Sequence, residues 1–237
     1  MPLHLVLLPG MDGTGDLFAP LEETLAGRLP VHRMAYPTDQ PMGYAQLAPW
    51  IRERLPAEPF VLLGESFSGP LAIELAAHPP AQLRGVVLCC TFAQAPRRWL
   101  APFQALASSA LLMRWTYRAA LAPMRWALLG RYATPSLNAL LSNAVLQVQP
   151  AVLARRLHEV SNVDVLGRLR GIRVPALALN ASDDRLIPRT CAQAMQQALP
   201  ALHAVRLTGP HCLLQAAPAA SAQALLDWCH RLEPPTA

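Results

Sequence analysis

The strongest indication of the fold is the segment Phe60-Val61-Leu62-Leu63-Gly64-Glu65-Ser66-Phe67-Ser68-Gly69. Its first four residues form a short apolar run, which is typical of a parallel strand buried on both faces. A turn of small residues follows, and then a helical pattern over residues 67–78 that ends before Pro79 and Pro80. The sequence therefore predicts a buried strand, a sharp turn that carries Ser66, and a helix.

This strand-turn-helix pattern is that of a nucleophile elbow, the turn that lifts a serine hydroxyl above the end of a sheet. Positions 64 and 68 need small residues because a larger side chain would clash with the neighbouring chain. Gly64 meets this need, whereas Ser68 replaces the usual glycine and Gly69 follows it. The opening helix would direct free N–H groups toward developing negative charge. The alternative is a plain turn in which the serine only caps the helix.

Five further apolar runs resemble the strand at residues 60–63. They are Leu3–Leu8, Val31–Tyr36, Val86–Cys90, Val174–Leu179 and Leu202–Leu207. Helical patterns separate them at residues 17–29, 44–55, 67–78, 189–199 and 219–232. Alternating strands and helices predict an α/β fold with a doubly wound, mostly parallel sheet.

Residues 95–170 interrupt the alternation because they contain no convincing strand. Prolines divide them into helical segments at Pro102, Pro123, Pro135 and Pro150. We interpret this stretch as a helical cap inserted into a core made of residues 1–94 and 171–237.

Composition is consistent with one such domain. The 237 residues are 53% hydrophobic and 15% charged, which excludes disorder as the main state. Five cysteines without a CxxC pair favour neither a disulfide framework nor a zinc site. No basic segment precedes the first apolar run, and no stretch is typical of a membrane span. We expect a soluble, reduced, cytoplasmic protein without stable membrane insertion.

A serine hydroxyl needs a base to take its proton and a third group to orient that base. Among the seven histidines, only His211 lies on a loop between the last predicted strand and the last helix, from which it could reach Ser66. The acid should also follow a strand. Asp183 and Asp184 both follow the run at residues 174–179. We favour Asp184, and Asp183 stays open as the alternative.

The loop after the first strand reads Leu8-Pro9-Gly10-Met11-Asp12-Gly13-Thr14-Gly15. Its glycines allow the backbone to turn amide groups inward. We expect the backbone N–H groups of Met11 and Phe67 to form an oxyanion hole. Nucleotide binding is the competing interpretation, but the loop fits neither GxGxxG nor a P-loop.

These segments together resemble the α/β-hydrolase superfamily over nearly the whole chain. The residues that carry the resemblance are Pro9-Gly10, Gly64–Gly69, Asp184–Pro188 and His211. The resemblance implies a Ser-Asp-His triad at Ser66, Asp184 and His211, in the chain order of that superfamily, and a helical cap over the site. It also implies chemistry without a metal or an organic cofactor.

The sequence departs from the superfamily pattern in places. Pro9 stands where histidine is commoner, Ser68 replaces a glycine, and the first two antiparallel strands have no counterpart. Residues 9–15 and 64–67 also look like short motifs of plant plastid esterase/acyltransferase proteins, but the match is too short to imply a substrate.

The implied activity is that of a serine hydrolase that cleaves a small-molecule carboxylic ester or thioester through an acyl-enzyme. An acyltransferase that uses the same intermediate is one alternative, and a membrane-surface lipase is another. Within the cap, Trp99, Trp115 and Trp126 are candidate contacts for an apolar acyl chain.

The net charge of +5 is unevenly distributed. Residues 95–173 carry 11 Arg against Glu159 and Asp164, hence +9, whereas nine Arg against 13 acidic residues leave −4 elsewhere. A basic cap could attract an acidic acyl carrier, such as acyl carrier protein or coenzyme A. Pimeloyl-ester carboxylesterases of biotin synthesis, which the chain resembles in general layout, work in that way. A solvated basic surface is the alternative, and no motif indicates nucleic-acid binding.

Overall fold

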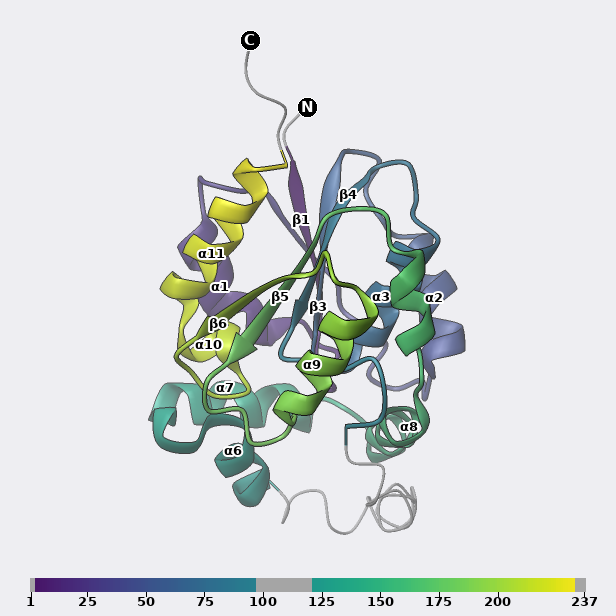
Figure 1. The fold of residues 1–237 in the computed structure, drawn as a ribbon. Coiled ribbons are helices and arrows are strands. Elements are labelled where there is room, and N and C mark those ends of the chain that lie inside the picture. The colour runs from purple at the N-terminus through teal and green to yellow at the C-terminus, as the bar shows by residue number, and fades with distance from the viewer. Residues whose placement is uncertain (1–2, 97–120, 233–237) are drawn as a thin grey trace.

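The computed structural model describes residues 3–96 and 121–232 of the chain (Figure 1). Within these ranges six strands form one sheet: β1 His4–Leu8, β2 Val31–Arg33, β3 Phe60–Glu65, β4 Leu83–Cys89, β5 Ala176–Ala181 and β6 His203–Leu207. Every neighbouring pair is parallel, and the strand order is β2-β1-β3-β4-β5-β6. The predicted α/β class with a parallel sheet is confirmed.

Helices cover both faces of this sheet. They are α1 Ala19–Leu25, α2 Tyr44–Arg52, α3 Gly69–Ala77, α9 Arg189–Ala198, α10 Leu213–Ala216 and α11 Pro218–His230. Figure 1 shows α1 and α11 along one side of the sheet and α2 and α3 along the other. Helix α1 is shorter than the predicted 17–29, because a short 3-10 helix, η1 Asp16–Phe18, precedes it and the chain turns at Gly27 with a φ of +72°.

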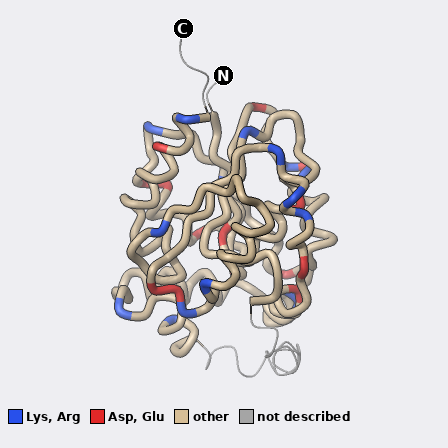
Figure 2. The backbone as a smooth tube through the Cα atoms, viewed as in Figure 1, with Lys and Arg blue, Asp and Glu red and all other residues tan. Residues whose placement is uncertain are grey.

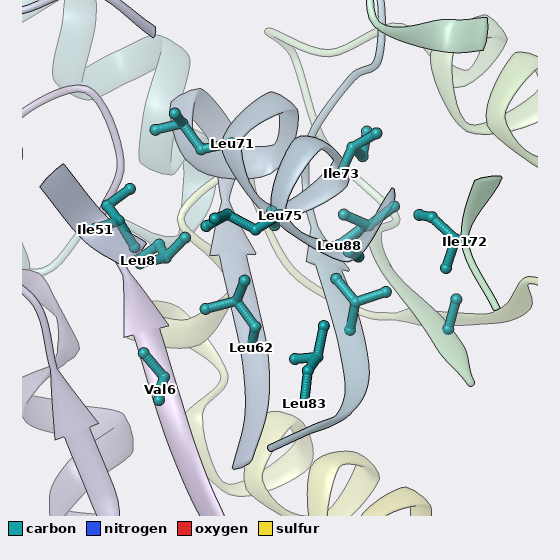
Figure 3. Close-up of a cluster of buried hydrophobic side chains, with 14 of the residues drawn as sticks. Val6, Leu8, Ile51, Leu62, Leu71, Ile73, Leu75, Leu83, Leu88 and Ile172 are labelled. Carbon is teal, nitrogen blue, oxygen red and sulfur yellow. The ribbon is translucent and has the colours of Figure 1, made fainter. Parts of the chain in front are cut away.

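Successive strand residues supply two apolar cores, one on each face. Leu62 of β3 packs on the α3 side, in a cluster with Leu71 and Leu75, and Figure 3 shows it next to Leu75 of that helix. Its neighbour Leu63 packs on the opposite side, in a cluster with Leu225 of α11. Burial on both faces explains why the predicted strands lack polar alternation.

The helical segments of the insertion are α6 Leu121–Leu129, η4 Gly130–Tyr132, α7 Pro135–Leu146, α8 Pro150–Asn162 and η5 Leu166–Gly171. Helices α6, α7 and α8 lie at the carboxyl ends of the strands (Figure 1), whereas the last helical turn of the insertion, η5, packs beside α3 and α9. No single helix in the described ranges is long and apolar enough to cross a membrane; α7 and α8 pass that test only as a pair bent by 99°. The predicted contacts Trp99 and Trp115 lie outside the described residues.

The strand order creates the place for a site. From β1, the second strand in the sheet, the chain moves to the edge strand β2, and it then returns to β3 on the other side of β1. The connections that follow β1 and β3 therefore leave the sheet on opposite faces, which opens a crevice between them at the carboxyl ends. The loop at residues 9–15 and the turn at Ser66 both begin there.

Candidate active site

Ser66 occupies a strained turn directly after β3. Its φ is +48°, in the left-handed region that side-chain-bearing residues rarely adopt. A short 3-10 helix, η2 Ser66–Ser68, leads into α3. Gly64 is required in this turn because a Cβ atom there would lie 2.6 Å from the Ser68 carbonyl oxygen. The local geometry is the one that the sequence predicts for this segment.

Buried hydroxyl groups tie the turn to its surroundings. The Ser68 hydroxyl donates to the Pro9 carbonyl and lies 2.7 Å from the Tyr36 hydroxyl. The Thr91 hydroxyl donates to the carbonyl of Ser66. The serine that replaces the usual glycine at position 68 therefore links the turn to the loop after β1, which sequence reasoning missed.

The side chains of Ser66, His211 and Asp184 meet in the crevice. His211 Nε2 lies 2.9 Å from Ser66 Oγ, and His211 Nδ1 lies 2.8 Å from Asp184 Oδ2. The Asp184 Oδ1 atom accepts the N–H groups of Leu186 and Ile187 at 2.9 and 2.8 Å. His211 is 4% exposed and the Asp184 side chain 8%, so water has little access to this chain of hydrogen bonds.

Asp183 points away from His211. Its carboxylate accepts hydrogen bonds from the Tyr132 hydroxyl at 2.6 Å, from Arg131 at 3.0 Å and from Ser182 at 3.1 Å. These partners lower the pKa of the Asp183 carboxyl, with the Tyr132 hydrogen bond as the largest cause. Of the two aspartates that the sequence left open, the structure places Asp184 against the histidine.

The loop after β1 turns tightly beside Ser66. The Gly13 N–H donates to the Gly10 carbonyl at 3.1 Å, so the N–H of the same Gly10–Met11 peptide points the opposite way. Within the described part of the chain this Met11 N–H donates no hydrogen bond. The loop therefore offers a free backbone donor at the position expected for the oxyanion hole.

A cavity of about 270 Å³ lies over these groups. Its floor includes Met11, Glu65, Ser66 and His211. Apolar side chains of the inserted helices form its wall: Met124, Leu128, Leu141, Val145, Leu153 and Leu157. The cavity thus combines polar groups on its floor with an apolar wall, as small-molecule sites commonly do.

Glu65 is a buried carboxyl on this floor, directly before Ser66. Burial raises its pKa to about 7, and the hydrogen bond from Gln215 at 3.1 Å opposes that shift. The Oε1 atom of Gln215 is itself buried without a partner among the described residues. No pattern in the sequence singles out Glu65. Within the described ranges, no group of three or more His, Cys, Asp or Glu side chains is arranged to hold a metal ion.

Trp126, the remaining predicted contact of the acyl chain, lies on the outer side of α6. It is 64% exposed, the Arg185 guanidinium lies 4.5 Å from its ring centre, and it is not among the residues that line the cavity. Met124 and Leu128 of the same helix line the cavity in its place. Helix α6 is apolar on several sides, so its sequence does not show which side faces the cavity.

The chain matches a family model and is similar in fold to solved structures. The model of the alpha/beta hydrolase family matches residues 5–224. Similar solved structures include the enol-lactonase from Burkholderia xenovorans LB400 (TM-score 0.84, 18% identity, covering 97% of this chain and 91% of that one). They also include a thermophilic esterase from Thermogutta terrifontis (0.82, 18%, 99% and 91%) and MenH from S. aureus (0.82, 15%, 98% and 95%). A search of curated proteins finds no match.

Proposed function

The chain belongs to the alpha/beta hydrolase family, and on that premise we propose that it is a serine hydrolase of carboxylic esters or thioesters. One observation carries the proposal. The Ser66 hydroxyl, the His211 ring and the Asp184 carboxylate form a continuous hydrogen-bonded chain at 2.9 and 2.8 Å, at the floor of an apolar cavity. A nucleophile, a base and an orienting acid in this arrangement are suited to acyl transfer.

In the proposed reaction, His211 takes the Ser66 proton while the serine oxygen attacks the substrate carbonyl. Asp184 holds the proton on Nδ1 and stabilises the imidazolium that forms. The N–H groups of Met11 and Phe67 hold the oxyanion, and each such donor contributes about 3–4 kcal/mol to transition-state stabilisation. His211 then protonates the leaving alcohol or thiol, and water cleaves the acyl-enzyme.

The cavity supports a substrate with a small, largely apolar acyl part. Its wall of leucine, valine and methionine side chains would leave a buried charge unpaired, which costs free energy. The three solved structures named above include an esterase and an enol-lactonase, which is consistent with an ester carbonyl as the reacting group.

Labelling with a fluorophosphonate probe tests the nucleophile. The wild-type protein should be labelled, and Ser66→Ala should abolish labelling and ester hydrolysis. The matched control is Ser136→Ala, which removes an exposed hydroxyl that does not line the cavity and should change neither. Labelling that persists in Ser66→Ala contradicts the proposal. A panel of esters and thioesters of varied acyl length, with and without an alcohol acceptor, separates hydrolysis from acyl transfer.

An acidic acyl carrier remains part of this proposal, but with a smaller basic surface than the sequence implies. Arg156, one of the 11 arginines counted there, is buried. Arg131, Arg155 and Arg168 pair with Asp183, Glu159 and Glu74. Figure 2 shows basic positions at both ends of the molecule rather than at the cap end alone. The carrier hypothesis therefore depends on a net electrostatic attraction between this protein and an acidic carrier. The change of the hydrolysis rate with salt concentration measures that attraction.

A further inference from the structure

Arg156, on the inserted helix α8, is buried against the loop that follows β1. The side chain is 1% exposed, and no carboxylate within the described residues lies at ion-pair distance. Its guanidinium donates instead to three backbone carbonyls: Met11 at 2.9 Å, Asp12 at 2.7 Å and Pro37 at 3.0 Å. A side chain of the insertion thus holds the backbone of the core loop that carries the expected oxyanion donor.

The surroundings of this cation connect it to the turn at Ser66 as well. The guanidinium carbon lies 5.7 Å from the ring centre of Tyr36 and 6.0 Å from that of Phe67. Phe67 provides the other expected oxyanion donor. Arg156 therefore contacts both segments from which the two N–H groups come, although it is not among the residues that line the cavity.

The contacts restrain how the loop can move. Residues 10–13 form a turn closed by the hydrogen bond from Gly13 N–H to the Gly10 carbonyl. Arg156 holds the Met11 and Asp12 carbonyls of this turn, so neither peptide can rotate without losing a charge-assisted hydrogen bond. Gly13 has a φ of +72° and leaves no room for a Cβ atom against the guanidinium. The turn and the cation therefore fit closely together.

We propose that Arg156 is a positioning residue that makes oxyanion stabilisation depend on the seating of helix α8. With α8 in place, the guanidinium fixes the turn and directs the Met11 N–H toward the substrate carbonyl oxygen. Without the guanidinium, the peptides of the turn reorient and this donor is lost. The effect acts on the transition state rather than on substrate binding, because the donor meets full negative charge only during the reaction. This inference rests on the proposed function.

Arg156→Ala tests the proposal through the split between kcat and KM. We expect kcat to fall by about 10²–10³-fold, the effect of losing one oxyanion donor, with KM within about threefold of wild type. Guanidinium chloride, well below denaturing concentrations, should raise the kcat of Arg156→Ala at least tenfold, whereas sodium chloride should not. The matched control is Arg155→Ala, which removes the neighbouring exposed arginine and its pair with Glu159 and should leave kcat unchanged.

Further measurements keep the test decisive if Arg156→Ala folds poorly. Arg156→Lys retains a cation but not the fork that reaches several carbonyls, so its kcat should be intermediate. Gly13→Ala disturbs the same contact from the loop side and should lower kcat without raising KM. A kcat within threefold of wild type in a folded Arg156→Ala, or a loss confined to KM, overturns the proposal. Absence of ester hydrolysis and probe labelling in the wild type instead overturns the proposed function.

Discussion

At the scale of single residues, the two adjacent aspartates show how position assigns different partners to the same chemical group. Asp184 accepts from His211 Nδ1 and from two backbone N–H groups, whereas Asp183 holds η4 through Tyr132 and Arg131. Both carboxylates are anchored, but only Asp184 can hold the imidazole tautomer that a serine nucleophile needs.

Replacing each aspartate by asparagine should therefore have unequal effects. Asp184→Asn should lower kcat by about 10³–10⁴-fold, because the amide no longer stabilises the tautomer with the proton on Nδ1. Asp183→Asn should change kcat by less than about threefold, since it alters only the contacts with η4. Steady-state hydrolysis of one activated ester measures both variants, and equal losses would contradict the assignment.

Glu65 predicts a pH dependence of stability. Its pKa of about 7 in the folded protein lies above the ordinary 4.5, so folding favours the protonated form. This contribution to stability is present below pH 4.5 and is lost as the pH rises through 7. The shift corresponds to about 3 kcal/mol in the free energy of unfolding at most. Glu65→Gln should remove this fall in the unfolding free energy with rising pH, as measured by urea unfolding at pH 5 and pH 8.

A matched variant checks this prediction about Glu65. Glu58 is exposed, and Glu58→Gln should keep the wild-type difference in unfolding free energy between the two pH values. The prediction fails if Glu65→Gln keeps the same difference.

What the sequence could predict about the site depends on where each residue stands. Ser66, Asp184 and His211 each follow a strand, so a pattern of alternating strands and helices is enough to bring them to one edge of the sheet. Arg156 lies inside a helix, where arginine normally faces solvent. A signal for its burial was its spacing of four from Val152 and from Val160, which places Arg156 on the apolar stripe of α8.

At the scale of elements, the turn between β3 and α3 depends on hydrogen bonds that cross between segments. The six strands were predictable because burial on both faces leaves continuous apolar runs. The ends of the strands were less predictable. Strand β2 covers only Val31–Arg33 of the predicted Val31–Tyr36, because the register with β1 ends there and one further hydrogen bond to β1 follows, from the Met34 N–H to the Leu7 carbonyl. The hydroxyl contacts of the turn leave no periodic signal in the sequence.

Ser68→Ala tests the importance of one such contact. The substitution leaves the buried Tyr36 hydroxyl and the Pro9 carbonyl without their partner. The unfolding free energy should fall by about 2 kcal/mol, because an unsatisfied buried polar group is costly. Ser136→Ala, at an exposed hydroxyl, is the control and should stay within about 0.5 kcal/mol. Urea denaturation measures both, and equal stability of the two variants would contradict the prediction.

Over the whole molecule, the part of the chain with a net positive charge nearly coincides with the segment inserted between β4 and β5. The sheet and its loops carry the groups proposed to react, and the inserted segment carries most of the excess arginine. If an acidic carrier delivers the acyl group, kcat/KM for a carrier-linked thioester should fall about tenfold or more between low and high salt. The matched free ester should change little. Equal, salt-insensitive rates for the two substrates would contradict the carrier hypothesis.

The floor and the wall of the cavity come from different parts of the chain, which affects how the acyl preference of such a protein can change. Side chains of α6, α7 and α8 shape the cavity, while bond cleavage is assigned to the loops after β1, β3, β5 and β6. Grafting these helices from a relative should therefore exchange acyl preference and leave the chemistry in place, with one condition. The grafted α8 must keep an arginine at the position of Arg156, facing the glycine at position 13, because the guanidinium fills the space that a Cβ atom there would need.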